Sequence, residues 1–242
     1  MQTKMNKCIA LLQARMSSTR LPGKVLMPLA EQPMLLRQVN RIKQAKSLDG
    51  IVVCTSQEKS DDPIAEFCRR NHIDCFRGAL NNVLSRFVDA AKKFPSEHYV
   101  RLTADCPLSD PEIIDSVVNQ HCAEKNDFTS NCMPYTLPDG LDVEVMSSET
   151  LRKIDDLASL EEHFEHVTKY VYQNTGSFKL GNFEYSRDYS KNRWTVDYPE
   201  DFTLVQHVFE HFKDTELFSL EEIVQFLEQN PDIKAINQKH ME

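Results

Sequence analysis

The chain has 242 residues, of which 40% are hydrophobic and 27% charged, and its formal net charge at pH 7 is -9. This length and composition are typical of one soluble globular domain with an ample hydrophobic core. The acidic balance disfavours broad binding to nucleic acids or anionic membranes, because both need a basic face. A small basic nucleotide site is still compatible with it.

The first half of the chain alternates between apolar strands and segments with helical spacing of apolar residues. Continuous apolar strands between helices predict a parallel sheet with helices on both faces and right-handed crossovers. The expected strands are 8–12, 50–55, 73–76 and 98–103, and the expected helices are 34–45, 61–70, 83–94 and 110–123.

This rhythm changes after Asn126. Two expected strands flank the turn Pro138-Asp139-Gly140, and shorter elements follow it. The simplest interpretation is a single domain over residues 1–242 with an inserted arm at about 126–190. The expected strands are 128–133, 141–146, 178–185 and 194–196, and the expected helices are a short one from 147 and those at 159–172, 199–211 and 220–229.

The loop after the first strand, residues 13–24, reads Q-A-R-M-S-S-T-R-L-P-G-K. A loop in this place lies at the carboxyl edge of the sheet, where ligands bind. Its three cations, Arg15, Arg20 and Lys24, with small hydroxyl residues between them, suit a polyphosphate. The loop matches neither the Walker motif nor the dinucleotide fingerprint. On the residues alone, a solvated basic connection is therefore the alternative.

Two acidic residues follow later strands. Asp105 ends the segment V-R-L-T-A-D, and Pro107 imposes an extended exit. Asp105 should therefore lie at the same sheet edge as the basic loop, where one or two carboxylates and phosphate oxygens hold magnesium. The alternative is that Asp105 caps a turn or the next helix. Asp197 follows strand 194–196 in the same way, whereas Glu200 and Asp201 suit the first turn of a helix.

Five motifs occur in order along most of the chain: the loop 13–24, T-A-D-C-P-L (103–108), P-D-G-L-D-V-E (138–144), E-H-V-T (165–168) and T-V-D-Y-P-E-D (195–201). Together they closely resemble the SpsF-like nucleotidyltransferases of spore coat polysaccharide biosynthesis. These enzymes are related to CMP-sugar synthetases such as 3-deoxy-manno-octulosonate cytidylyltransferase. The resemblance implies a Rossmann-like α/β fold of the glycosyltransferase-A type, with three layers and a mostly parallel mixed sheet.

The resemblance also implies an enzyme that transfers a nucleoside monophosphate from an NTP, with CTP favoured, to a sugar or sugar-acid acceptor and releases pyrophosphate. Its place would be the synthesis of surface polysaccharide or glycan precursors. Mg²⁺ would be held by Asp105 and Asp197, and Arg15 and Lys24 would be catalytic. The residues expected to bind the nucleotide are Leu12, Gln13, Ala14, Arg15, Ser17, Arg20, Lys24, Gly78, Asn82, Arg86, Thr103 and Asp105.

Two segments of the chain depart from the family pattern. Ala104 stands where the family has glycine, and Asn81-Asn82 replaces an acidic pair near the base and ribose. Asn82 is also a sufficient N-cap for the helix that follows it. Gly78 and Arg86 are the positions of this segment that match the family better.

The acceptor is expected to bind at the arm. Asp142 and Glu144 would share one face of a strand, and their carboxylates would accept hydrogen bonds from sugar hydroxyls. On the pattern alone the alternative is a solvated face. His166 lies in a segment similar to the family's E-H-V-T motif and is expected in the acceptor pocket, with a plain surface position as the alternative, and the same two interpretations stay open for His163. A homodimer formed through residues 126–190 is expected by analogy with the family.

The sequence leaves two other functions open. A glycosyltransferase of the same fold would use a nucleotide-sugar, although Asp105-Cys106-Pro107 lacks the second acid of D-x-D. A non-catalytic nucleotide-binding subunit is the second, because a fold does not fix a function.

Three features predict a cytoplasmic protein without a membrane partner. Residues 1–7 lack the apolar segment of a signal peptide, and no stretch is long and apolar enough to cross a bilayer. The seven cysteines are scattered without a C-x-x-C pair, which indicates reduced thiols and argues against zinc.

Overall fold

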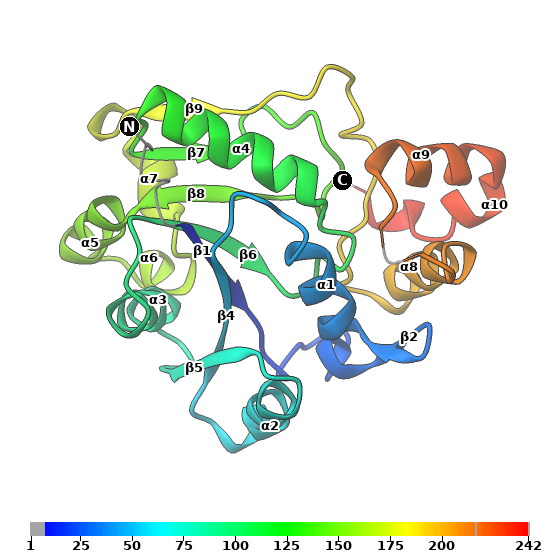
Figure 1. Ribbon diagram of the computed structural model, residues 1–242, viewed down its shortest axis with the longest axis horizontal. Helices are drawn as coiled ribbons and strands as arrows, with labels where there is room; N and C mark the ends of the chain where they lie inside the picture. Colours follow the sequence, from blue (N-terminus) through cyan, green and yellow to red (C-terminus); the bar gives the residue numbers. More distant parts are fainter. Residues whose placement is uncertain (1–7, 216, 242) are drawn as a thin grey trace.

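The computed structural model describes residues 8–215 and 217–241, so the expectation about a signal peptide at 1–7 lies outside it. A seven-stranded sheet runs through the molecule in the order β5-β4-β1-β6-β8-β7-β9 (Figure 1). Neighbours pair in parallel from β5 to β6, β8 runs antiparallel to β6 and β7, and β9 is parallel to β7. The strands are β1 (Cys8–Gln13), β4 (Gly50–Ser56), β5 (Asp74–Gly78), β6 (His98–Thr103), β7 (Phe128–Ser130), β8 (Glu144–Ser147) and β9 (Leu180–Asn182).

Helices cover both faces of this sheet, which confirms the predicted α/β fold with a mostly parallel mixed sheet. In β1 the pleat divides the core: Ala10 and Leu12 pack with the helices of one face, and Leu11 packs with those of the other. The first face carries α1 (Met34–Ile42), α2 (Asp62–Arg70), α4 (Pro111–Glu124), α8 (Pro199–His211) and α9 (Leu220–Gln229). The second face carries α3 (Val83–Lys93), α5 (Ser148–Leu157) and α7 (Lys169–Gln173).

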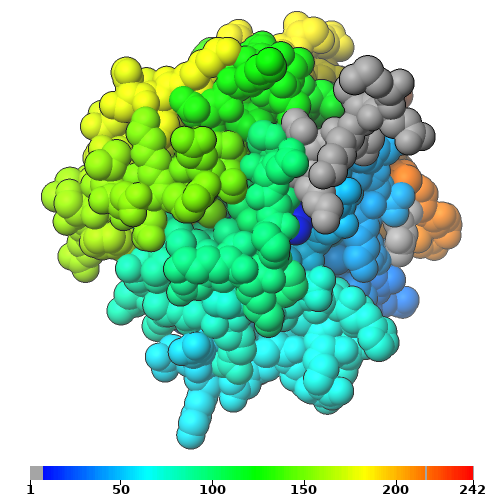
Figure 2. Space-filling view, turned by 60° about the vertical axis from the view of Figure 1, so that its left-hand side comes forward, coloured from blue at the N-terminus to red at the C-terminus, as the bar shows by residue number. Residues whose placement is uncertain are grey.

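The segment 126–190 contributes β7, β8 and β9 to the same sheet as the first half. Figure 2 shows this segment, in green to yellow, joined to the cyan first half along one continuous surface. The remaining elements are β2 (Pro28–Leu29) and β3 (Gln32–Pro33), which form a small hairpin, α6 (Glu161–Glu165), α10 (Pro231–Lys234) and the 3-10 turns Lys24–Leu26, Lys59–Asp61, Thr175–Ser177 and Gln238–His240.

Several predicted elements of the second half are wrong in extent. The expected strands 128–133, 141–146 and 178–185 shrink to β7, β8 and β9, and no strand forms at 194–196, where Arg193 makes only an isolated bridge to Asp139. The expected helix 159–172 is two short helices, α6 and α7, with extended backbone at His166. β-branched Val167 and Thr168 favour this break, since branching at Cβ lowers helix propensity.

No helix in the described parts of the chain has the length and apolar character needed to cross a membrane. Five of the cysteines, Cys8, Cys54, Cys68, Cys106 and Cys132, are buried.

Candidate active site

The basic loop after β1 is closed by its own backbone. The carbonyl of Met16 accepts hydrogen bonds from Ser18 N and Gly23 N, both at 3.0 Å. Gly23 has a φ of 73°, a left-handed conformation that glycine adopts without strain. The side chain of Asp61, fully buried at the start of α2, accepts from Met16 N at 2.8 Å and from Ser56 in β4. The hydrogen bond to Asp61 therefore fixes the start of the loop at Met16, and the bond from Gly23 to the Met16 carbonyl fixes its end.

Lys24 joins the two predicted metal carboxylates. Its buried ammonium lies 3.3 Å from Asp105 Oδ2 and 3.0 Å from Asp197 Oδ1, and it donates to the carbonyl of Val196 at 2.6 Å. Asp105 lies 81 positions and Asp197 173 positions from Lys24 in the sequence, and both carboxylates contact its Nζ. The backbone supports this meeting, because Val196 N donates to the Asp105 carbonyl at 2.7 Å.

Asp197 is surrounded by three cations. Besides Lys24, Arg20 lies 2.9 Å from Oδ1 and Arg193 lies 3.0 Å from Oδ2. Burial opposes ionisation of this carboxyl, but the charge of Lys24, followed by Arg20 and Arg193, outweighs it and lowers the pKa of Asp197. Asp197 is therefore ionised throughout the physiological range.

A cavity of about 250 Å³ lies over this cluster at the carboxyl edge of β1 and β6. It brings together eight of the residues predicted to bind the nucleotide or metal, and it leaves out the side chains of Leu12, which is fully buried in the core, and Ser17, which is exposed on the loop. The predicted residues that line it are Gln13, Ala14, Arg15, Arg20, Lys24, Thr103 and Asp105, and Asp197 closes it.

The predicted base and ribose segment, Gly78 to Arg86, lies beside this cavity rather than in its lining. A Cβ on Gly78 would stand 2.9 Å from Cγ of Arg86, so the glycine lets α3 approach β5. Arg86 is buried, donates to the Ala79 carbonyl at 3.1 Å and leaves its Nε without a partner. Burial, opposed by Cys54 and Asp61 and helped by nearby Arg15, lowers its pKa. Asn82 caps α3 by accepting from Ser85 N at 2.8 Å.

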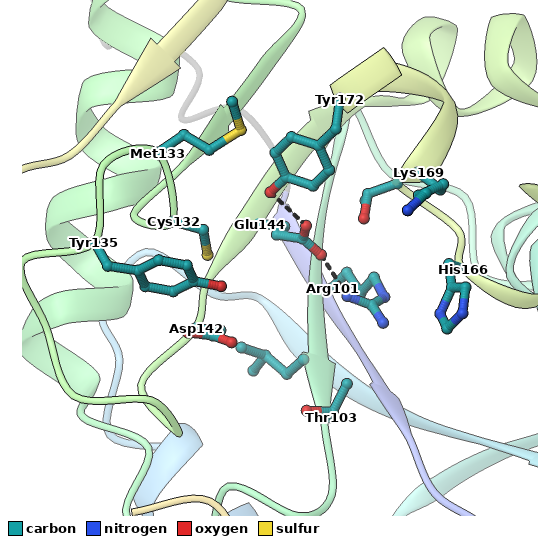
Figure 3. A pocket seen from close by; sticks show the side chains of 12 residues that line it. Arg101, Thr103, Cys132, Met133, Tyr135, Asp142, Glu144, His166, Lys169 and Tyr172 are labelled. Atoms are coloured by element: carbon teal, nitrogen blue, oxygen red, sulfur yellow. Dashed lines mark hydrogen bonds and ion pairs between the residues drawn. The ribbon is translucent and has the colours of Figure 1, made fainter. Parts of the chain in front are cut away.

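A second cavity, of about 490 Å³, lies between the sheet and the arm (Figure 3). It shares Thr103 with the first cavity, so the two adjoin at the end of β6. In Figure 3 the phenol of Tyr135 and the carboxyl of Asp142 lie on one side, with Lys169 and His166 on the other. All three residues predicted to bind the acceptor, Asp142, Glu144 and His166, line this cavity.

The two carboxyl groups in this cavity differ in their partners. Glu144 lies 2.5 Å from Arg101 Nη1 and accepts from the Tyr172 hydroxyl at 2.7 Å, as the dashed lines of Figure 3 mark. No hydrogen bond or ion pair within the described parts of the chain engages the Asp142 carboxyl. Burial, followed by the charges of Asp139 and Glu144, raises the pKa of Asp142 to about 7.

The expectation that Asp142 and Glu144 share one face of a strand is wrong. Asp142 precedes β8 instead of lying in it, so strand alternation does not place the two side chains. The turn before them does. Gly140 has a φ of 110°, and a Cβ there would stand 2.4 Å from the backbone nitrogen of Thr195. This close approach lets Arg193 reach Asp139 at 2.7 Å and ties the arm to the Asp197 segment.

The two histidines of the arm have different surroundings. His166 is exposed and lines the second cavity, whereas His163 is buried. Nδ1 of His163 accepts from the backbone of Ser159 and Leu160, and its Nε2 lies 2.7 Å from Gln173 Oε1. His163 therefore holds α6 against α7.

The donor set at Lys24 fits a magnesium ion. Asp105 and Asp197 come from different segments and already share one cation, the Lys24 ammonium. Mg²⁺ takes one or two protein carboxylates and completes its shell with phosphate oxygens and water. The two carboxylates of this cluster thus match what the ion requires from a protein.

Sequence reasoning missed Asp61 and Arg193. Asp61 was read only as a helix start, and its contact with Met16 spans 45 positions, which no local pattern reveals. Arg193 bridges Asp139, Asp197 and Asp201. The one hint in the sequence was that Arg193 stands four residues before Asp197. Because no regular strand forms there, strand alternation could not predict which way the Arg193 side chain points.

Comparison with known proteins fits this geometry. A family model described as Cytidylyltransferase matches residues 9–240. The spore coat polysaccharide biosynthesis protein SpsF of Bacillus subtilis is 32% identical over 94% of this chain and 97% of its own. A cytidylyltransferase structure from Leptospira borgpetersenii superposes with a TM-score of 0.91 at 35% identity, covering 95% of this chain and 97% of that one.

A more distant structure, a CMP:2-keto-3-deoxy-manno-octonic acid synthetase complexed with CTP, shares the fold with a TM-score of 0.64 at 16% identity, covering 85% of this chain and 99% of that one. The match of the family model over nearly the whole chain, supported by relatives above 30% identity, decides the family. The chain belongs to the cytidylyltransferase family.

Proposed function

We propose that this protein transfers CMP from CTP, with Mg²⁺, to a sugar-like acceptor and releases pyrophosphate. The observation that carries the proposal is the meeting of Asp105 and Asp197 on the Lys24 ammonium, at the edge where the basic loop opens. The family membership supports cytidine as the base and a product of the CMP-sugar type. The name of the Bacillus subtilis relative supports a role in polysaccharide biosynthesis.

The mechanism assigns each group from its position. Arg15 and Arg20 flank the phosphate-side cavity, where their guanidinium groups bind the β- and γ-phosphates and neutralise the charge of the leaving pyrophosphate. Lys24 contributes a buried positive charge next to the α-phosphate. Asp105 and Asp197 would hold the magnesium ion, which supplies charge neutralisation at the phosphates and lowers the pKa of a bound hydroxyl.

The acceptor binds in the cavity beyond Thr103. Its hydroxyls donate to Asp142 and Tyr135 on one wall, and an anionic substituent faces Lys169 and His166 on the other. This placement lets the acceptor oxygen approach the α-phosphorus in line with the leaving group. Holding the two reactants in this way accounts for much of the rate enhancement in such transfers.

A binding screen tests the nucleotide part of the proposal. The melting temperature of the wild type is measured with ATP, GTP, CTP and UTP, each with and without Mg²⁺. Ligands that bind the native state raise it by mass action, so CTP with Mg²⁺ should give the largest shift. Equal silence from all four nucleotides would overturn the proposal, and a preference for another base would correct it.

The catalytic part is tested with Lys24→Ala (K24A). Loss of one preorganised electrostatic contact should lower pyrophosphate release across a panel of sugar acids and sugar phosphates by about tenfold or more. Lys92→Ala is the matched control, because that lysine is exposed and its one ion pair among the described residues is with Asp89 on α3. Unchanged turnover in K24A would remove Lys24 from the mechanism, and release of CDP from a CDP-sugar would assign a glycosyltransferase instead.

We also propose a cytoplasmic homodimer that pairs through the arm. Five of the seven large hydrophobic side chains that are exposed in the described parts of the chain lie within 126–190. Exposed apolar side chains that are concentrated in one segment favour an interface in that segment. Sedimentation should give a mass of two chains, and Leu160→Glu should shift it to one. The five side chains are Met133, Tyr135, Leu157, Leu160 and Leu180.

A further inference from the structure

The C-terminal segment packs against Tyr198, the residue after Asp197. After α10 the chain turns back toward the body of the domain (Figure 1). There the imidazole of His240 stacks on the ring of Tyr198, with ring centroids 3.8 Å apart and an angle of 2° between the planes. Its Nε2 lies 3.1 Å from Glu200 Oε2, so the histidine is held by α8 as well. A residue at the far end of the sequence therefore contacts the segment that carries Asp197.

Tyr198 in turn contacts Arg20. The guanidinium carbon lies 4.7 Å from the centre of the tyrosine ring, and Nη1 donates to the hydroxyl at 3.3 Å. Arg20 has about half of its side chain exposed, and its only other contact of this kind within the described residues is the ion pair with Asp197 at 2.9 Å. An exposed arginine has many rotamers, and two fixed partners reduce that freedom before a ligand arrives.

We propose that His240 is a positioning residue for the nucleotide. By stacking on Tyr198 it fixes the ring against which Arg20 lies, and so presents the guanidinium to the phosphates beyond the α-phosphate. The inference rests on the proposed function, because it assigns Arg20 to a triphosphate. The inference goes beyond the proposed function because it makes the C-terminal turn, residues 238–240, a part of the nucleotide site.

The geometry predicts which ligands lose affinity when His240 is replaced. CMP has no β- or γ-phosphate, so its affinity should not depend on Arg20 or on the residues that hold it. The affinity for CTP should depend on both Arg20 and the residues that hold it. A merely structural role for His240 would lower both affinities together or lower only the melting temperature of the free protein.

The test measures dissociation constants for CTP and CMP, each with Mg²⁺, by titration calorimetry. His240→Ala should weaken CTP binding by about fivefold to tenfold, on the scale of one charge-assisted contact made less favourable by disorder, and leave CMP binding unchanged. His240→Phe keeps a flat ring on Tyr198 and should stay within about twofold of the wild type.

Lys239→Ala is the matched control. Lys239 comes from the same turn and pairs with the same glutamate, Glu200, at 2.6 Å, but no ring contact joins it to Tyr198. It should leave both dissociation constants unchanged. If Lys239→Ala weakens CTP as much as His240→Ala does, the effect belongs to the C-terminal turn as a whole and the inference is overturned.

A double-mutant cycle locates the route of the effect. In an Arg20→Ala background, His240→Ala should cause no further loss of CTP affinity, because the group it positions is gone. Additive losses would overturn the inference. The two proposals fail separately: a wild type that binds no CTP overturns the proposed function, whereas a wild type that prefers CTP to CMP, with the same preference in His240→Ala, overturns only the role of His240.

Discussion

Asp197 and Asp142 are both partly enclosed carboxyls in adjoining cavities, yet their electrostatic states differ. Asp197 has Lys24, Arg20 and Arg193 around it, and they lower its pKa despite burial. Asp142 has acids for neighbours and no partner of its own within the described residues, and burial with those acids raises its pKa to about 7. Under the proposed function, Asp197 on the phosphate side is thus paired with cations before a ligand binds. On the proposed acceptor side, Asp142 has no such pairing, and the acceptor would supply its partner.

This difference extends to the surrounding backbone. The basic loop is anchored to β4 and α2 through Asp61, and its cations come from residues close together in sequence. The acceptor-side cavity is lined by short segments of the arm that meet the sheet at β8. An anchored loop at one cavity and short irregular segments at the other are consistent with the proposed function, in which the loop binds the nucleotide and the arm binds the acceptor.

The largest effect is expected from removing the anchor of the loop. Asp61→Ala leaves the partly buried backbone N–H of Met16 and both buried donors of Ser56 without an acceptor. Three unsatisfied donors, two of them buried, should lower the free energy of unfolding by about 5 kcal/mol. Urea denaturation measures it, with Asp62→Ala as the neighbouring control, because Asp62 is exposed and, within the described part of the chain, forms one ion pair, with Arg77. A loss of similar size in both variants would mean that the start of α2, and not the loop, depends on these acids.

Asp142→Asn should stabilise the protein in alkaline solution. An unfolded aspartate loses its proton near pH 4, but the folded state keeps it until about pH 7, so native stability falls as the pH rises through that window. The asparagine variant escapes this loss, which amounts to about 4 kcal/mol above pH 7. Denaturation at pH 8 and at pH 4 measures it. An equal gain at both pH values would contradict the raised pKa, because at pH 4 the folded wild type still holds the proton of Asp142 and little of the loss has occurred.

The two halves of the chain also differ in how well their sequence predicts them. In the first half each strand is a continuous apolar run and each crossover is a helix, so periodicity and right-handed connection place β1, β4, β5 and β6. The cations of the loop and Asp105 follow from that placement alone. Asp105 and Asp197 meet as the motifs suggested, but no local pattern fixes that meeting.

The arm resisted prediction for physical reasons. Its strands pair over three or four residues, too few for alternation to identify, and the break at His166 is fixed by tertiary contacts of His163. Asp142 reaches its cavity through the turn at Gly140 and not through a strand. Contacts such as Asp61 to Met16 and His240 to Tyr198 join distant segments, and single-sequence patterns carry no information about them.

His121 joins the two halves and should make that junction sensitive to acid. It is fully buried on α4, where its ring contacts Thr129 of β7 and His98 of β6. Burial, followed by His98, lowers its pKa to about 4. The unfolded histidine takes up a proton near pH 6.5, so stability present above that pH is lost as the pH falls toward 4, by about 3 kcal/mol.

His121→Gln removes the titrating group and keeps a polar side chain near Thr129. Between pH 6.5 and 4 its free energy of unfolding should fall less steeply than that of the wild type, by about one proton's worth of slope. Hydrogen exchange adds a local measurement, because the amides of β7 should lose protection in the wild type over the same window. Parallel pH profiles for the two proteins would exclude His121 as the source.

The smallest expected effect separates two roles of Asn82. As the cap of α3 it accepts from Ser85 N, and Asn82→Ala should lower stability by about 1 kcal/mol. Asn82→Asp caps equally well and should restore the wild-type stability. If Asn82 only caps, CTP affinity will be the same in both variants once the protein is folded, and the base contact belongs to Gly78, Arg86 or the loop. If instead the aspartate variant keeps its stability but changes the preference among the four nucleotides, position 82 faces the base, and the phosphate side is less fixed than its paired charges indicate.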